Sequence, residues 1–253
     1  MKDQFVLEVC CSNIESVLAA NKAKANRIEI CSGPYEGGIT PSYGFIKYAK
    51  EHFQGEVMVL IRPREGDFYY LAEEFETMKE DIKVCKELGV AGVTLGILQT
   101  NGYVDIKRTT ELVSLASPMV VCFNRAFDMT INYFEAWEDI VKCGCKRVLT
   151  SGGSSNAIGG VNNLDLLNQR AGTSIEIIAA GGLNSVNMSR IFKQTGLRQY
   201  HLSAKQLKRS IMRYRNLKVS LGNFSEIPEY SYEVSNADRI VRAKNALLNK
   251  MQA

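Results

Sequence analysis

The sequence lacks the marks of several protein classes. Its 253 residues contain no apolar run long enough to cross a membrane, and the N-terminus leads into a strand pattern without a signal peptide. The net charge of +4 is mild. The one basic stretch, at 205–218, is broken by apolar residues, so we interpret it as a solvated helix or loop. We therefore predict a cytoplasmic protein that binds neither membranes nor nucleic acid.

Common catalytic and metal-binding motifs are also absent. There are only two histidines, and neither the C-x-x-C nor the H-x-x-x-H spacing occurs. No Ser-His-Asp arrangement can be recognised. The cysteine count of seven is odd, which together with the missing signal peptide favours reduced thiols over a disulfide framework. Cys143 and Cys145 are one residue apart, not two, and we interpret them as a helix end and a turn.

Short apolar runs alternate with segments of helical periodicity along the whole chain. Eight such alternations of about thirty residues predict parallel strands joined by helical crossovers. This number favours closure into a single α/β domain, a (β/α)₈ TIM-type barrel spanning residues 1–253, with a C-terminal helical tail from about 237. An open doubly wound sheet is the alternative, but no G-x-G-x-x-G follows the first strand. The expected strands are 5–10, 27–31, 57–61, 92–98, 119–124, 147–151, 174–180 and 199–203.

The first two expected strands end alike, with a glutamate and a cysteine two residues apart. Side chains alternate along a strand, so Glu8 and Cys10 share one face, as do Glu29 and Cys31. The apolar residues between them suit the face against the helices, which leaves the Glu and Cys pairs inside the barrel. Neighbouring strands lie about 4.8 Å apart, so the two thiols can approach each other. A thiolate pair suits Cu(I); the alternative is that both cysteines are small buried fillers, since free cysteine is among the most buried residue types.

Buried carboxylates need partners, and the other strand ends supply candidates. These are Arg62, Arg64, Arg125 and His201. In the barrel, His201 lies on the strand beside Glu8, so Glu8, Glu29 and His201 form a possible acid–base group. The arginines are expected to offset the carboxylates or to bind an anionic ligand. Asp128 could hold Arg125 in place.

Glycine-rich loops follow the sixth and seventh expected strands. Ser151 and Gly152 belong to the first loop, and Gly181 and Gly182 to the second. Glycine there lets backbone N–H groups approach a ligand, and barrel phosphate sites often form near strands seven and eight. These residues are candidates for anion binding, although tight turns alone would also explain the glycines.

At the strand ends the chain resembles the CutC family, which is named for copper homeostasis. The resemblance extends from about residue 5 to 223 and is carried by the segments LEVC, NRIEICSGPYEGGITPS, VLIRPREGDFYY, FNRAFD, RVLTSGGSSNAIGG and YHLSA. It implies a (β/α)₈ barrel, a cytoplasmic setting, a homo-oligomer, and a copper ion, Cu(I), bound by Cys10 and Cys31.

The chain departs from the family pattern at two places. Asn124 stands where the family usually has a histidine, and 179–182 reads AAGG where the family commonly has a proline and a third glycine. Asparagine is neither an acid nor a base, so a role given to that histidine does not transfer to this chain.

The residues support two hypotheses of different classes. One is a copper homeostasis protein that holds Cu(I) at Cys10 and Cys31. The other is an enzyme for a small phosphorylated or carboxylated metabolite, with acid–base chemistry from the Glu8, Glu29 and His201 group and an arginine-lined anion site. A polar barrel mouth of purely structural origin is a weaker reading, because burying many charges stabilises a fold poorly.

Overall fold

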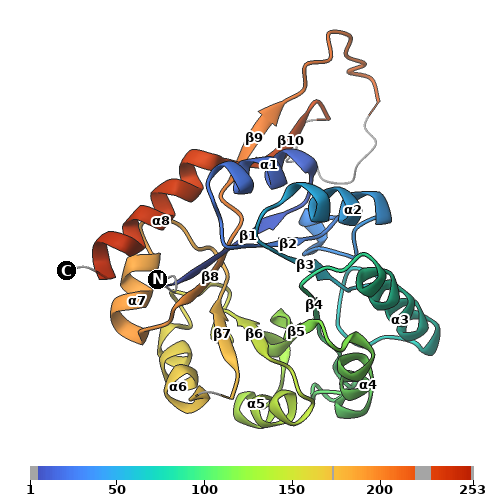
Figure 1. The fold of residues 1–253 in the computed structure, drawn as a ribbon, viewed down its shortest axis with the longest axis vertical. Coiled ribbons are helices and arrows are strands. Elements are labelled where there is room, and N and C mark those ends of the chain that lie inside the picture. The colour runs from blue at the N-terminus through green and yellow to red at the C-terminus, as the bar shows by residue number, and fades with distance from the viewer. Residues whose placement is uncertain (1–4, 173, 220–228, 252–253) are drawn as a thin grey trace.

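The computed structural model, described for residues 5–172, 174–219 and 229–251, is a closed barrel of eight parallel strands surrounded by helices (Figure 1). Consecutive strands pair along the chain, and β8 closes the barrel against β1. The predicted (β/α)₈ architecture is confirmed. In chain order, the barrel strands are β1 (Val6–Cys11), β2 (Arg27–Ile30), β3 (Glu56–Leu60), β4 (Gly92–Leu95), β5 (Val120–Phe123), β6 (Arg147–Thr150), β7 (Glu176–Ala179) and β8 (Gln199–Leu202).

The helices lie outside the strands in a single layer (Figure 1). They are α1 (Ile14–Lys22), α2 (Tyr43–His52), α3 (Ala72–Glu87), α4 (Ile106–Ala116), α5 (Tyr133–Lys142), α6 (Val161–Ala171), α7 (Met188–Thr195) and α8 (Ala237–Met251). Two short 3₁₀ helices, η1 (Pro34–Glu36) and η2 (Arg125–Met129), lie in the loops after β2 and β5. These loops belong to the C-terminal face of the barrel, where sites of such barrels are built.

Side chains that cap helix N-termini fix where several helices begin. Asn13 accepts a hydrogen bond from Ser16 N at the start of α1, and Asp105 accepts one from Arg108 N at the start of α4. Each cap satisfies a backbone donor that the helix itself leaves unpaired. The caps set the length of each strand-to-helix loop and thereby the rim around the site.

The buried apolar residues form two separate cores. The larger one fills the space between the strands and the helices. The smaller one lies inside the barrel and comprises Met58, Cys122, Leu149, Ile178 and Ala180. Because side chains alternate along a strand, the same strands supply both cores. The inner core fills the middle of the barrel and leaves polar side chains above it and below it.

A two-stranded arm projects from the barrel after β8 (Figure 1). β9 (Lys205–Arg209) pairs antiparallel with β10 (Ser231–Ser235), and α8 follows. The interpretation of 205–218 as a helix or loop is wrong for its first five residues. Their backbone pairs with β10, and Lys208 lies over the Tyr232 ring at 5.9 Å. None of the helices in the described ranges has the length and apolarity needed to cross a membrane.

Candidate functional site

The barrel register places an ion pair and a histidine around Glu8. Glu8 on β1 lies level with Arg27 on β2 and with His201 on β8. Its carboxylate, only 3% exposed, forms a salt bridge with Arg27 Nε and a hydrogen bond of 2.7 Å with His201 Nδ1. Arg27 also donates to Gln199 Oε1 at 2.8 Å. Glu8 therefore contacts both Arg27 and His201, and its hydrogen bond fixes the orientation of the imidazole.

These partners keep Glu8 ionised. Burial alone would raise the pKa of its carboxyl, but the positive charge of Arg27 and the hydrogen bond from His201 outweigh burial and lower the pKa from 4.5 to about 2. A buried carboxylate is tolerated when it is paired and hydrogen-bonded in this way. Glu8 therefore acts as a fixed negative charge rather than as a proton donor near neutral pH.

The two strand-end thiols meet as the alternation predicts. Cys10 Sγ and Cys31 Sγ are 3.8 Å apart. The hydrogen bond with Cys31 and burial raise the pKa of the Cys10 thiol well above its ordinary value, although His201 acts in the opposite direction. In the absence of a metal, Cys10 is therefore a protonated thiol at neutral pH. A ligand that binds its sulfur as a thiolate must displace that proton.

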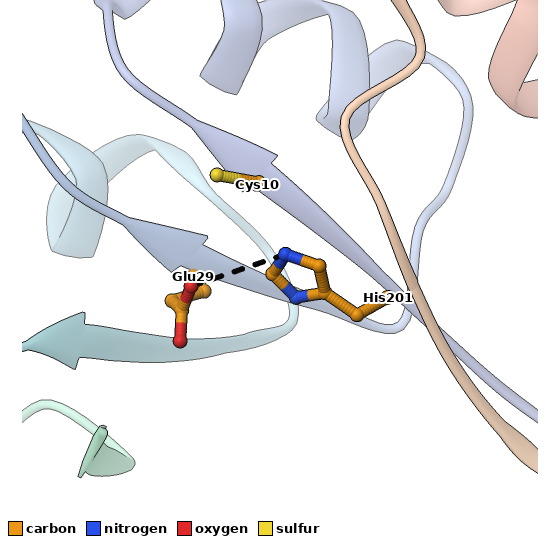
Figure 2. A group of neighbouring side chains, drawn as sticks. All are labelled: Cys10, Glu29 and His201. Carbon is orange, nitrogen blue, oxygen red and sulfur yellow. Dashed lines mark ion pairs between the residues drawn. The ribbon is translucent and has the colours of Figure 1, made fainter. Parts of the chain in front are cut away.

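Cys10 also belongs to a second group of possible ligands, with Glu29 and His201 (Figure 2). One ligand atom from each of the three residues lies within 4.8 Å of the others. His201 Nε2 is 4.0 Å from Glu29 Oε2. Burial disfavours the imidazolium, but hydrogen bonds with Cys10 and Glu8 and the charges of both glutamates raise the pKa of His201 well above 6.5. Thiol, carboxylate and imidazole thus converge from three strands.

Glu29 is the least satisfied polar residue of this group. Its Oε1 is buried without a hydrogen-bond partner among the described residues. Burial raises the pKa of the Glu29 carboxyl, although the charge of His201 opposes this shift. A carboxyl group in this state can exchange a proton with a ligand more readily than Glu8 can.

A cavity of about 330 Å³ opens above this cluster at the C-terminal face of the barrel. Cys10, Glu29 and His201 line it from the strands, Cys31 from the residue directly after β2, and Arg125 from the loop after β5. The cavity is larger than a bare ion requires and lies within the size range of small-molecule sites. It therefore has room for a metal ion, an organic ligand, or both.

Arg125 is held in place by Asp128, as the sequence predicts. Its Nε donates to Asp128 Oδ2 at 2.8 Å, and its Nη2 donates to Ser151 Oγ at 2.8 Å. Asp128 also accepts hydrogen bonds from the backbone N–H groups of Ser151 and Gly153. These bonds fix the guanidinium while 40% of the Arg125 side chain stays exposed at the cavity.

The other two predicted arginines have mainly structural contacts. Arg62 lines the cavity, but its Nη1 donates to Glu36 O and Gly38 O, both at 2.8 Å. Arg64 lies outside the residues that line the cavity and is engaged by Glu74 at 2.8 Å. The expectation that these arginines pair with the strand glutamates is wrong, because the loop after β3 turns their guanidinium groups toward loop carbonyls and surface acids.

The four glycine-loop candidates separate into two pairs. Gly181 and Gly182, with φ of 95° and 70°, line the cavity. Ser151 and Gly152 do not; Ser151 is fully buried between Asp128 and Arg125. A Cβ on Gly152 would lie 2.2 Å from Gly160 O, so this glycine is needed for a close backbone approach.

Sequence reasoning missed Arg27, the main partner of Glu8. Its signal was present, because the alternation that turns Glu29 and Cys31 inward also turns Arg27 inward. Asn124 also lines the cavity, and its Oδ1 accepts a hydrogen bond from Ala126 N at 2.9 Å at the start of η2. The side chain that replaces the usual family histidine therefore serves as a cap.

Fold and site together define a (β/α)₈ barrel with a thiol pair and a carboxylate–imidazole cluster under its C-terminal face. The chain belongs to the CutC family, which it matches over residues 5–206. It is 41% identical over 237 residues to a CutC family protein of Bacteroides fragilis, covering 93% of this chain and 94% of that one.

Two further relatives support the same assignment. A human protein named copper homeostasis protein cutC homolog is 38% identical over 243 residues, covering 96% of this chain and 89% of the human one. The crystal structure of a protein described as the copper homeostasis protein CutC of Streptococcus agalactiae superposes with a TM-score of 0.75 at 32% identity, covering 79% of this chain and 98% of that one.

Proposed function

We propose that this protein binds Cu(I) through Cys10 and Cys31 and takes part in copper homeostasis. The observation that carries the proposal is the 3.8 Å separation of the two sulfurs at the cavity. Paired thiolates are preferred ligands of Cu(I). The names of the human and streptococcal relatives agree with this function. All seven cysteines are free in the structure, so Cys10 and Cys31 are not tied up in disulfides.

The donor set fits such an ion. Metal–thiolate bonds of about 2.3 Å place two opposed sulfurs roughly 4.6 Å apart. The observed separation of 3.8 Å is shorter than this. To bind the ion, the two sulfurs would either move slightly apart or form a bent arrangement with a third ligand beside Cys10. Glu29 and His201 are the available third groups. Since the pKa of Cys10 is raised, binding would release its proton, and Glu29 is a nearby acceptor for it.

A competition titration against a chromophoric Cu(I) chelator under anaerobic conditions tests this proposal. We expect Cys10→Ser and Cys31→Ser each to lower the Cu(I) affinity more than tenfold, because a hydroxyl is a poor ligand for a soft ion. Cys143→Ser is the matched control, because its thiol lies in the helical layer and donates to Ile106 O. Equal affinities in the wild type and both site variants would overturn the proposal.

The unpaired Oε1 of Glu29 favours a second candidate function. A buried carboxyl oxygen without a partner, on a residue that lines a cavity far larger than an ion, suits an enzyme that acts on a small phosphorylated or carboxylated metabolite. Glu29 would exchange a proton with the substrate. His201, oriented by Glu8, would stabilise negative charge, and Arg125 would hold the anionic group.

A thermal-shift screen of such metabolites tests this candidate. A ligand at a hundred times its Kd stabilises the folded state by about 2.7 kcal/mol, which raises the Tm of a protein of this size by several degrees. We expect Glu29→Gln and Arg125→Met to reduce that rise, whereas Arg170→Met, on the outer surface, should not. A screen in which no metabolite shifts the wild type would count against the enzyme.

A further inference from the structure

A second hollow lies beside the barrel cavity and has no role in either function described above. It has a volume of about 700 Å³ and lies between the loop at 183–187, the residues that follow β8, and helix α8. Leu183, Leu202, Ser203 and Lys205 line both this groove and the cavity. The two spaces are therefore neighbours with a common wall at the end of β8.

The lining of this groove is positively charged. It includes Lys205, Arg239 and Arg242 and no acidic residue. Lys205 is partly neutralised by Glu233, 2.7 Å from its Nζ, and Arg239 donates to the backbone carbonyl of Lys205. Arg242 has neither an ion pair nor a hydrogen bond to any residue in the described ranges. The charges of Arg239 and Arg242 are therefore left without an acidic partner in the groove.

The loop opposite these arginines is fixed by its own asparagines. Asn184 Oδ1 accepts hydrogen bonds from Val186 N at 2.9 Å and from Asn187 N at 3.2 Å. Asn187 Oδ1 accepts one from Asn184 N at 2.8 Å, and its Nδ2 donates to Gly182 O at 2.8 Å. A surface loop with so many internal bonds presents a fixed wall rather than an adaptable one. Gly182 connects this wall directly to the cavity.

We propose that this groove binds the anionic group, phosphate or carboxylate, of an elongated small ligand. Two arginines three residues apart on α8, in a groove whose lining contains no acid, match such a group, since each guanidinium can donate two hydrogen bonds to it. The position agrees with the general tendency of barrels to bind phosphate near strands seven and eight. The rest of the ligand would pass Ser203 and enter the cavity beside His201. Only this last step rests on the second candidate function.

Titration of the metal-free, isotope-labelled protein with inorganic phosphate tests the groove. We expect shifts in the backbone amides of 183–187 and in the Nε–H signals of Arg239 and Arg242. Arg242→Met and Arg239→Met should each weaken phosphate binding at least fivefold. Arg213→Met, an equal loss of charge on the exposed arm, should not. No shift in the groove, or equal weakening in all three variants, would overturn the proposal.

Longer probes decide whether the ligand reaches the cavity. Glycerol 3-phosphate should shift both the groove amides and the imidazole signals of His201, while inorganic phosphate should shift the groove alone. His52, the other histidine, lies on the outer helix α2 and is the internal control. A three-carbon dicarboxylate distinguishes carboxylate from phosphate as the preferred group. Groove shifts without a His201 response to any probe would refute the elongated ligand.

The Cu(I) titration also tests whether the groove and the proposed Cu(I) site bind their ligands independently. Arg242→Met should bind Cu(I) as tightly as the wild type, because Arg242 lines the groove and not the cavity. Cys31→Ser should bind phosphate normally. If Arg242→Met weakened Cu(I) binding as much as phosphate binding, the groove would not be an independent anion site.

Discussion

Replacing Arg27 with methionine is expected to lower the free energy of unfolding by about 3–5 kcal/mol. Arg27 is 1% exposed and pairs with Glu8, whose carboxylate is 3% exposed. Methionine fills much of the same volume but leaves a charged carboxylate buried with His201 as its remaining partner. Removing one member of a buried pair is far more harmful than the pair itself is stabilising.

Urea unfolding at pH 7 measures this loss. Arg170→Met is the matched control, because Arg170 and Glu138 form a pair of half-exposed side chains that should contribute less than about 1 kcal/mol. The double variant Glu8→Gln with Arg27→Met should be more stable than the sum of the two single losses predicts, since it removes both charges together. Equal losses for Arg27→Met and Arg170→Met would show that the pair is not buried in solution.

The pH dependence of the free energy of unfolding tests whether ionised Glu8 is responsible for this stabilisation. Its pKa is lowered in the folded state, from 4.5 to about 2. Its contribution to stability is therefore complete above about pH 4.5 and is lost as the pH falls toward 2. A shift of this size corresponds to a contribution on the order of 3 kcal/mol. Glu8→Gln should lack this part of the acid destabilisation, and an unchanged acid profile would contradict the assignment.

Site residues on strands could be predicted from the sequence, whereas most of those on loops could not. A period of two residues fixes which strand side chains share a face, and so it predicted that Cys10, Cys31 and Glu29 meet inside the barrel. The same rule reaches Arg27. A prediction built on the strand ends alone does not include that residue, because Arg27 begins its strand, level with Glu8 of β1.

Loop residues could not be placed in the same way. Arg62 and Arg64 follow a strand closely in sequence, but their orientation depends on carbonyls at 36–38 and on Glu74, which no local periodicity specifies. The arm was missed for a related reason. β9 and β10 are separated by more than twenty residues in the sequence. The five residues of β9 include two lysines and an arginine, so their strand conformation depends on pairing with β10 rather than on an apolar alternation of their own.

The second-largest loss of stability is expected on replacing Asp128, in the loop after β5. Its carboxylate accepts hydrogen bonds from Arg125 Nε, Thr150 Oγ1, Ser151 N and Gly153 N, and its side chain is 5% exposed. Hydrogen bonds to a charged group contribute about 1.5–3 kcal/mol, and the donors on the buried residues Thr150 and Ser151 would lose their Asp128 partner. We expect Asp128→Ala to lower the free energy of unfolding by about 3 kcal/mol or more.

The same substitution should release Arg125, because the Nε contact that sets the direction of its guanidinium is lost. Urea unfolding measures the loss of stability, and the Nε–H signal of Arg125 in an NMR spectrum reports its mobility. Asp67→Ala is the matched control: Asp67 also pairs with an arginine, Arg64, but its side chain is 74% exposed, so the change should lie within about 1 kcal/mol. If Asp128→Ala were as stable as Asp67→Ala, with Arg125 still ordered, then Ser151 and Ser154, which also bind the guanidinium, would be sufficient to hold it at the cavity.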